Sequence, residues 1–501
     1  MPETPYETLV RLLKRADLIG SALDLLRWDE QVNLPPASSA RRGGQSAALA
    51  ELHHQAATDP AIGETLAQLE AALPDLDELQ QVVVRRARRD FDREIRLPSA
   101  FVAARATLDS EAFHAWKLAR ERSGFASFAP FLSRQIEMAK QEAAYQGCSE
   151  RPYDYLLDKF DPGLTEAEVS RLFSELRAEL VPFVREIVAA GAQSRRAEMK
   201  GFPITAQDTF LREVTRRIGF DFQRGRIDVA VHPFCSGDAA DTRLTTRFFE
   251  DDPLSSLFSA VHEAGHGLYE QGLPLEHLGT PLGKAVGMAI HESQSRLWEN
   301  QVARSRSFWT HFEPAFREKF SARLGGWSSD DIYLAINTVE LKPIRVESDE
   351  VTYNLHIMLR FELERRLFGS ELLVADLPRA WNELSRELLG LTPESDAVGV
   401  LQDVHWSGGA FGYFPSYCVG NMIAAQFWYA ALEAMPDLEA RFAEGDFSDL
   451  LAWLRREVHS HGRRFDTGEL VRKVTGAKLA PTRLMRYLRE RYGPLYLPAT
   501  R

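Results

Sequence analysis

The chain has 501 residues, of which 45% are hydrophobic and 26% are charged, and this composition argues against a disordered or low-complexity protein. Sixty Lys and Arg residues against 72 Asp and Glu residues give a formal net charge of −12. That charge argues against a broad nucleic-acid-binding surface and against binding to anionic membranes. The length predicts several domains unless one large helical scaffold takes the whole chain.

The N-terminal segment, residues 1–17, mixes charged and apolar residues. It has neither the uninterrupted apolar core nor the small-residue cleavage site of a signal peptide. No apolar run approaches the length of a membrane span. Cys148, Cys235 and Cys418 are far apart and odd in number, which indicates a reducing compartment without a disulfide framework. We therefore expect a cytoplasmic protein with no membrane partner and no nucleic-acid partner.

Helical periodicity dominates the chain. Residues 6–28 and 449–465 have apolar side chains at spacings of three and four, which is typical of amphipathic helices. The mixed charges of residues 85–96 favour a solvated helix face over a binding patch. Residues 225–232 alternate and predict a strand. Without a flexible linker or an internal repeat, the sequence predicts a mainly α fold with a small β element near residue 230, continuous over residues 1–501.

The most informative feature is His262-Glu263-Ala264-Gly265-His266. Histidines at positions i and i+4 of a helix lie one above the other, so both imidazoles can bind one divalent ion. The intervening Glu263 can then act on the attacking water as a general base. A match of this kind is expected by chance only about 0.03 times in a chain of this composition.

The surrounding residues predict a helix around this motif. Asp251-Asp252-Pro253 is a typical helix start, and the helix is expected to run through Tyr269-Glu270 and stop at Gly272. Gly265 and Gly267 each weaken a helix by about 1 kcal/mol relative to Ala. We therefore expect another element or a substrate to approach the helix closely at these glycines.

Two histidines do not complete a catalytic zinc site, which usually has three protein ligands. The metzincin pattern is excluded, because it requires Gly and His at the positions of Tyr269 and Gly272. A helix expected over residues 287–301 offers Glu292 as the third ligand. Glu299 lies two turns later on the same face and can support the ligands, whereas His291 points about 100° away and is a weaker candidate. Such a site predicts metal-assisted amide hydrolysis.

Several further segments form an ordered set of motifs along the chain. In chain order they are Trp28-Asp29 with the double proline that follows, His232-Pro233-Phe234, Asp241 to Thr245, His262 to His266, His291 to Gln294, Ile344 to Asp349, and Gly399 to Trp406. With these segments the chain resembles the carboxypeptidase Taq family of thermostable-carboxypeptidase-like metallopeptidases. Ser348 departs from the family pattern, which usually has Ala there, and its hydroxyl needs a hydrogen-bond partner if it is buried.

The resemblance implies the architecture of helical, cleft-containing peptidases such as neurolysin and angiotensin-converting enzyme. It implies a large two-lobed body with a deep central cleft, the metal helix at its floor and the N-terminal helices in part of its wall. It also implies a homodimer that acts on peptides.

The same resemblance implies roles for residues that do not bind the metal. Arg345 is the favoured holder of the substrate's terminal carboxylate, with Arg243 as the other candidate, because arginine binds carboxylates through two parallel hydrogen bonds. The alternative for each is a structural ion pair, Arg345 with Asp349 or Glu350 and Arg243 with Asp241. For stabilising the oxyanion, His405 and Tyr417 are preferred and Tyr413 is held in reserve, while His232 is a candidate to bind the peptide backbone.

The sequence leaves three functions to distinguish. The first is a metallocarboxypeptidase that releases single C-terminal residues with broad specificity. The second is an oligopeptidase that cleaves internal bonds of short peptides. The third is a peptide-binding protein that has lost catalysis, which the intact motif argues against. Zinc is the expected cofactor, with cobalt or manganese as alternatives, because such ligand sets accept all three.

Overall fold

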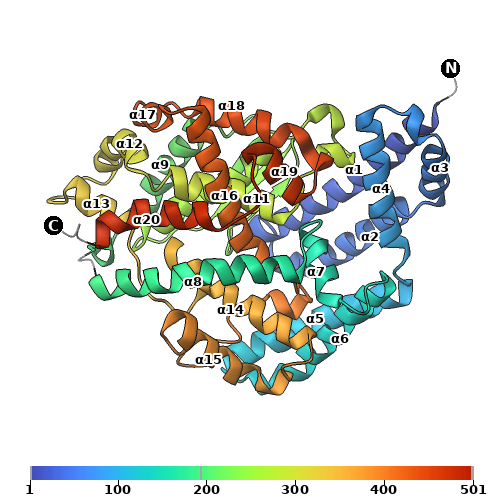
Figure 1. The fold of residues 1–501 in the computed structure, drawn as a ribbon, viewed down its shortest axis with the longest axis horizontal. Coiled ribbons are helices and arrows are strands. Elements are labelled where there is room, and N and C mark those ends of the chain that lie inside the picture. The colour runs from blue at the N-terminus through green and yellow to red at the C-terminus, as the bar shows by residue number, and fades with distance from the viewer. Residues whose placement is uncertain (1–2, 192–193, 498–501) are drawn as a thin grey trace.

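The computed structural model describes residues 3–191 and 194–497, which fold mainly into α-helices (Figure 1). The helices before the sheet are α1 (Pro5–Val32), α2 (Ser39–Ala57), α3 (Pro60–Ala71), α4 (Glu78–Ile95), α5 (Ser99–Glu121), α6 (Ala129–Tyr145), α7 (Pro152–Phe160), α8 (Glu166–Ala190) and α9 (Ile204–Arg217). Those after it are α10 (Pro253–Glu270), α11 (Met288–Arg296), α12 (Arg306–Lys319), α13 (Ser329–Ile336), α14 (Glu350–Phe368), α15 (Leu377–Leu389), α16 (Phe414–Ala434), α17 (Leu438–Ala443), α18 (Ser448–Glu457), α19 (Thr467–Thr475) and α20 (Thr482–Tyr496).

Outside the region of the histidine motif, two predictions for helical segments differ from the structure. The helix expected over residues 449–465 ends at Glu457, and the chain turns at Gly462, whose φ is 48°. In α4 the expected solvated face is present at the exposed Arg85 and Arg96. Arg86 and Arg89 instead form ion pairs with acidic residues of distant segments, so this face also joins α4 to the rest of the molecule.

A small three-stranded sheet lies beside α10. It contains β1 (Gly225–Val229), β2 (Cys235–Gly237) and β3 (Thr242–Thr246) in the order β1-β3-β2. β1 runs parallel to β3 with Gly225 opposite Thr242, and β2 runs antiparallel to β3 with Cys235 opposite Leu244. The predicted strand at residues 225–232 is therefore confirmed as far as Val229, and the other two strands were not predicted.

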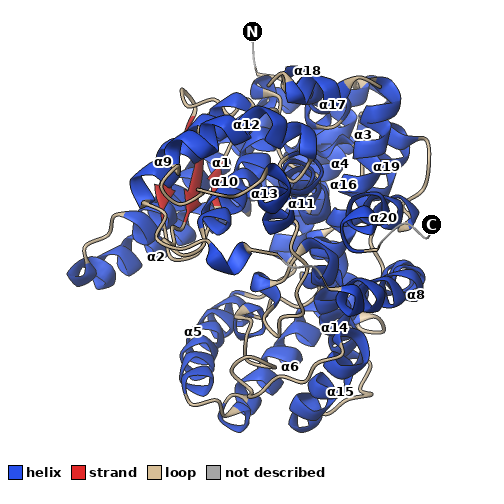
Figure 2. Ribbon diagram, turned by 90° about the vertical axis from the view of Figure 1, so that its left-hand side faces the viewer, coloured by secondary structure: helices blue, strands red, loops and turns tan. Residues whose placement is uncertain are grey.

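The helices form two groups (Figure 2). One group contains α5, α6, α14 and α15, and the other contains the sheet together with α9, α10, α11, α12 and α16. The mainly α, two-lobed fold expected from the sequence is confirmed. The depth of the expected cleft between the groups stays a prediction, as does the part of the N-terminal helices in its wall.

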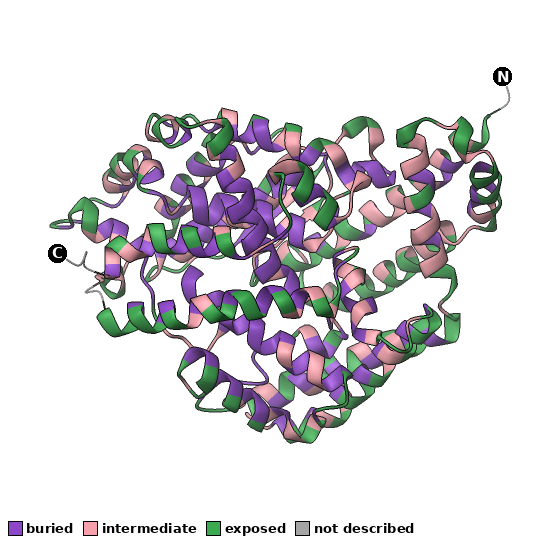
Figure 3. Cartoon of the chain, viewed as in Figure 1, coloured by how far each residue is buried: buried purple, intermediate pink, exposed green. Residues whose placement is uncertain are grey.

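Buried residues gather around α10, α11 and α16 (Figure 3), and α11 packs along α16. This main core extends from Leu108 to Tyr496. The N-terminal helices have a second, smaller apolar cluster, which contains Leu9, Leu66 and Val84. The description as a single domain over residues 1–501 therefore stays a prediction. None of the helices that the structure describes is both long and apolar enough to cross a membrane.

Candidate metal centre

Helix α10 carries both histidines of the motif and begins where the sequence predicts. The Asp252 side chain accepts a hydrogen bond from the backbone N–H of Ser255, and Pro253 occupies the first turn, where its missing N–H costs nothing. Leu254, Leu257 and Val261 are buried on one side of the helix. This packing fixes the rotation of α10 and leaves the histidines on the neighbouring face.

Glu292 reaches the two histidines because α10 and α11 approach very closely. A Cβ on Gly265 would lie 2.5 Å from the Cα of Ser295, so only glycine allows this contact. The expected close approach at Gly265 is confirmed, and Gly267 packs in the same way against the ring of Phe220. The reason for both glycines in the motif helix is therefore packing against neighbouring elements.

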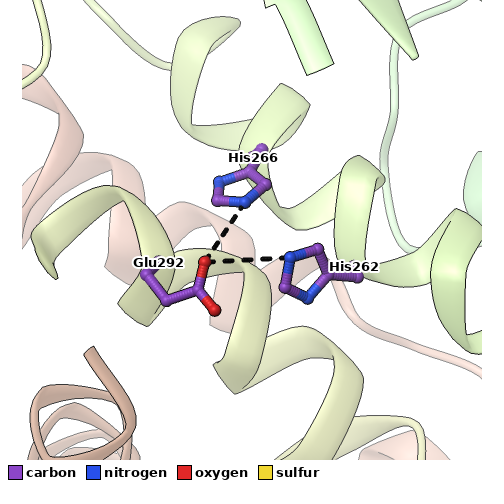
Figure 4. A group of neighbouring side chains, drawn as sticks. All are labelled: His262, His266 and Glu292. Atoms are coloured by element: carbon purple, nitrogen blue, oxygen red, sulfur yellow. Dashed lines mark ion pairs between the residues drawn. The ribbon is translucent and has the colours of Figure 1, made fainter. Parts of the chain in front are cut away.

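The three side chains form one group (Figure 4). The Oε2 atom of Glu292 lies 3.5 Å from Nε2 of His266 and 3.8 Å from Nε2 of His262. One donor atom from each residue lies within 4.8 Å of the other two. Two imidazole nitrogens and one carboxylate oxygen in this arrangement fit a divalent ion of the zinc type.

Hydrogen bonds to the far side of each imidazole support this fit. Nδ1 of His262 lies 2.9 Å from Oε2 of Glu299, and a carboxylate can only accept, so Nδ1 carries the proton and Nε2 is left with its lone pair. Nδ1 of His266 lies 2.5 Å from Nδ1 of His291, whose Nε2 contacts Glu270 at 2.7 Å. His291 thus lies behind His266, which agrees with its lower rank as a ligand.

Burial and neighbouring charges together set the protonation of this group. Burial lowers the pKa of His266 to about 3, which keeps the ring neutral. Burial raises the pKa of Glu263 to about 7. Burial also raises the pKa of Glu292, but the nearby Arg296 and His262 outweigh it and hold that pKa well below its ordinary value. The carboxylate of Glu292 is therefore ionised and the His266 ring is unprotonated, as metal ligands must be.

The segment that carries Glu299 is not a regular α-helix. After α11 the chain forms a π-helical turn over Leu297–Val302, a feature that is frequent at functional sites. Arg491 of α20 donates to the carbonyl oxygens of Asn300 and Gln301, the latter at 2.9 Å. A side chain from the last helix therefore satisfies carbonyls at the end of this turn.

The aromatic residues expected near the site lie together at the start of α16. Nε2 of His405 is 3.3 Å from the hydroxyl of Tyr417, and the rings of Tyr413 and Tyr417 are 5.2 Å apart. Gly420, one turn after Tyr417, packs against Glu292 so closely that a Cβ there would lie 2.8 Å from the Glu292 side chain. This contact places the start of α16 beside the His262, His266 and Glu292 group.

Arg345 is buried and forms an ion pair that local sequence did not reveal. Its Nε and Nη2 donate to Oδ1 of Asp403 at 3.0 and 2.8 Å, and its Nη1 donates to the hydroxyl of Tyr353 at 2.8 Å. The alternative prediction, an ion pair with Asp349 or Glu350, is wrong about the partner. Asp349 instead caps α14, and Glu350 accepts hydrogen bonds from Tyr487 and Tyr492 of α20.

Arg243 and His232 lie in and beside the sheet. Arg243 forms the ion pair with Asp241 that was the alternative prediction, at 2.8 Å, and its guanidinium lies 4.2 Å from the centre of the Trp28 ring. His232 is exposed in the loop between β1 and β2. Ser348 finds the partners that a buried hydroxyl needs, the carbonyl of Ile344 at 3.0 Å and His356 at 2.9 Å.

Sequence reasoning missed two groups around this centre. Arg296 contacts both Glu292 and Glu299, and its spacing of one helical turn from Glu292 could have indicated the contact. Asp403 pairs with Arg345 and also with the fully buried Arg360. Asp403 belongs to a motif that was recognised, but its partners lie 58 and 43 residues away in the chain.

Comparison with known proteins identifies the family. The family model described as Carboxypeptidase Taq (M32) metallopeptidase matches residues 8–492. The chain belongs to this family. Within the family, the chain is 41% identical to thermostable carboxypeptidase 1 of Thermus thermophilus, with 99% of each protein covered. It is 37% identical to carboxypeptidase 1 of Bacillus subtilis, with 97% of each covered.

Solved structures of the M32 family agree with this fold. The M32 carboxypeptidase from Deinococcus radiodurans matches with a TM-score of 0.95 at 41% identity, over 98% of this chain and 99% of that one. Metallocarboxypeptidase 1 of Trypanosoma cruzi matches with a TM-score of 0.94 at 34% identity, over 98% and 100%. The predicted family and activity are confirmed: the chain is a metallocarboxypeptidase, a hydrolase that acts on peptides with a divalent metal ion.

Proposed function

We propose that this metallocarboxypeptidase releases single C-terminal amino acids with broad specificity, and that it binds one zinc ion through His262, His266 and Glu292. The observation that carries the proposal is the convergence of three donor atoms within 4.8 Å, with Glu263 next to His262 on the same helix. Cobalt and manganese are the alternatives to zinc, because ligand sets of this kind accept all three ions.

The bound ion supplies Lewis-acid polarisation of the scissile carbonyl and of the attacking water. The residues of the chain then divide the remaining work. Glu263 takes a proton from the water and transfers it to the leaving amine. The hydroxyl of Tyr417 and the ring of His405 donate hydrogen bonds to the oxyanion that develops on the carbonyl. The contact of 3.3 Å between Nε2 of His405 and the Tyr417 hydroxyl supports a shared role, because the two proposed donors lie next to each other.

Arg345 is the proposed holder of the substrate's terminal carboxylate. A guanidinium has five N–H donors, and three of them are used by Asp403 and Tyr353, which leaves two for a substrate. Its guanidinium carbon lies 5.1 Å from the centre of the Tyr417 ring, beside the proposed oxyanion donors. Tyr413 and His232 remain candidates for substrate contacts, whereas the contacts of Arg243 with Asp241 and Trp28 favour a structural role.

The role of Glu263 is tested by Glu263→Gln. This variant keeps the shape of the side chain but cannot accept a proton, so we expect hydrolysis of an N-blocked dipeptide to fall roughly 10²- to 10⁴-fold. The zinc content should stay near one ion per chain. Full activity with normal zinc content would contradict the assignment of the base.

The cleavage mode is tested by comparing a peptide with its C-terminal amide. An exopeptidase that binds the terminal carboxylate through Arg345 should cleave the free acid much faster than the amide, because charge-assisted hydrogen bonds are about twice as strong as neutral ones. The products, resolved by mass, should be single residues. Equal cleavage of both substrates at internal bonds would favour the alternative, an oligopeptidase.

We also propose that the protein is a cytoplasmic homodimer without nucleic-acid partners. The free thiols of Cys148, Cys235 and Cys418 support the cytoplasmic location. The net charge of −12 supports the lack of polyanionic partners. Exposed apolar side chains on α1 support a partner surface, since Leu18 is 70% exposed and Leu25 is 42% exposed. Sedimentation velocity should give a mass of two chains.

A further inference from the structure

Arg296 is a largely, but not fully, buried cation that the proposed mechanism does not use. It lies one helical turn after Glu292, and its side chain is 15% exposed. Its Nε donates to Oε1 of Glu292 at 2.7 Å, and its Nη1 donates to Oε2 of Glu299 at 3.1 Å. One guanidinium therefore joins two carboxylates of the same helical segment.

The contact with Arg296 gives the two oxygens of the Glu292 carboxylate different partners. Oε2 faces the imidazoles of His266 and His262, at 3.5 and 3.8 Å. Oε1 is held by Arg296. The Glu292 side chain has little freedom to rotate, because rotation would break a charge-assisted hydrogen bond that is partly shielded from water.

Through Glu299, Arg296 also supports a second proposed metal ligand, His262. Oε2 of Glu299 accepts from both Arg296 and Nδ1 of His262. Arg304 donates to the other oxygen at 3.2 Å and is itself held by the carbonyl of Ile336 at 2.7 Å. Arg296 also lies between two like charges, Glu292 and Glu299, whose repulsion it offsets.

The position of Arg296 is fixed by its own surroundings. Its guanidinium carbon lies 4.6 Å from the centre of the Tyr353 ring, and this stacking orients the plane of the guanidinium. The hydroxyl oxygen of Tyr353 in turn accepts a hydrogen bond from Nη1 of Arg345, at 2.8 Å. Tyr353 thus contacts both Arg296, which holds Glu292, and Arg345, the proposed holder of the substrate's carboxylate.

We propose that Arg296 is a positioning residue for the metal ligands, holding Glu292 directly and His262 through Glu299. The inference rests on the proposed ligand set. Groups that orient ligands typically contribute a factor of ten to 100 in metal affinity. Lysine cannot replace Arg296 fully, because its single ammonium lacks the rigid fork of N–H groups that reaches two carboxylates.

The experiment measures Zn²⁺ affinity by competition with a coloured chelator for the wild type, Arg296→Met and Arg296→Lys. We expect the Kd of Arg296→Met to rise about tenfold to 100-fold, and that of Arg296→Lys to rise severalfold. The visible spectrum of the Co²⁺-loaded variants should also differ from that of the wild type, since a released Glu292 changes the surroundings of the ion. A purely structural arginine would alter neither quantity.

Arg306→Met is the matched control. Arg306 also pairs with a carboxylate, that of Asp330 at 2.9 Å, and stacks on an aromatic ring, that of Tyr333 at 4.0 Å, but both members of its ion pair are exposed. Its Zn²⁺ affinity should equal that of the wild type.

A Kd of Arg296→Met within twofold of the wild type would overturn the inference while leaving the proposed ligand set intact. Failure of the wild type to bind Zn²⁺ would instead overturn the ligand set, so the two failures are distinguishable. If Arg296→Met does not fold, Arg296→Lys decides in its place, and an unchanged Kd for that variant overturns the inference.

Discussion

Asp161 shows how one buried carboxyl group can hold several segments of this site together. It follows α7 and is 1% exposed. Its Oδ1 accepts the backbone N–H of Ala289 at 2.7 Å, and its Oδ2 accepts the hydroxyl of Ser416 at 2.6 Å. Helix α11 begins at Met288, and Gly287 before it has no side chain for capping, so Asp161 caps the helix from another part of the chain. The same residue also anchors α16.

Replacing Asp161 with Asn should change how stability depends on pH. Burial raises the pKa of Asp161 to about 6 from an ordinary value of 3.8. Because the folded state binds the proton more tightly, this group favours folding most below about pH 4, and that contribution is lost as the pH rises through 6. Asn cannot ionise and can still serve both partners. Relative to the wild type, Asp161→Asn should therefore gain on the order of 3 kcal/mol between pH 4 and pH 7.

Thermal unfolding of both proteins across this pH range measures the effect. Asp161→Ala is the matched control, because it also lacks the ionisable group but loses the cap of α11. Its Tm should lie below that of Asp161→Asn at every pH, with a parallel pH dependence. A Tm difference between the wild type and Asp161→Asn that is constant with pH would contradict this assignment.

At the scale of the elements, the proposed metal group depends on the contact between α10 and α11. The two helices approach closely at Gly265, where a Cβ would lie 2.5 Å from the Cα of Ser295. A neighbouring backbone cannot move aside as a flexible side chain can. The helices must therefore separate if any larger residue occupies this position, and Glu292 would move away from His262 and His266.

Gly265→Ala should accordingly destabilise the protein and weaken metal binding together. Overpacking costs about 1–3 kcal/mol, which exceeds the gain of up to about 1 kcal/mol from better helix propensity. Gly44→Ala is the control, since a Cβ at Gly44 in α2 meets nothing within 4 Å and the gain in propensity stands alone. Tm and the Zn²⁺ Kd of both variants check this. A Gly265→Ala variant as stable as Gly44→Ala would show that the helix contact is not limiting.

Sequence predicted the elements of this site well where the signals were local. Asp252 and Pro253 predicted the start of α10 correctly, and the helix expected after it offered Glu292 as the third member of the group that the structure brings together. The strands β2 and β3 were missed because β2 has three residues and β3 is buried along nearly its whole length, so neither shows clear alternation.

Interactions between distant segments were beyond the reach of these patterns. Arg345 has acidic residues one turn away, at Asp349 and Glu350, and periodicity favours them as partners. The structure instead pairs it with Asp403, because Asp349 is already used as a helix cap. The π-helical turn at Leu297–Val302 likewise has a distant partner, because its carbonyls accept hydrogen bonds from Arg491, which no local signal connects to it.

At the scale of the whole molecule, a metal ion held by two helices should stabilise the fold. An ion that binds only the folded chain stabilises it by about 2.7 kcal/mol at a free concentration of 100 times its Kd. For a protein of 501 residues this corresponds to a rise in Tm of about 2–3 °C.

Calorimetry at a fixed scan rate should therefore give a higher Tm with Zn²⁺ than after chelation. Glu292→Ala is the matched control and should lose this difference, because it removes one of the three proposed ligands. An equal Tm with and without Zn²⁺ in the wild type, at concentrations that load the site, would argue that α10 and α11 do not hold the ion between them.

The contact of Arg491 with the π-helical turn limits how early this part of the chain can complete its fold during synthesis. The carbonyls of Asn300 and Gln301 leave the ribosome about 190 residues before the arginine that satisfies them. Until α20 has emerged, the segment that carries Glu299 lacks this partner. The peptidase centre can therefore reach its native arrangement only after synthesis has passed α20.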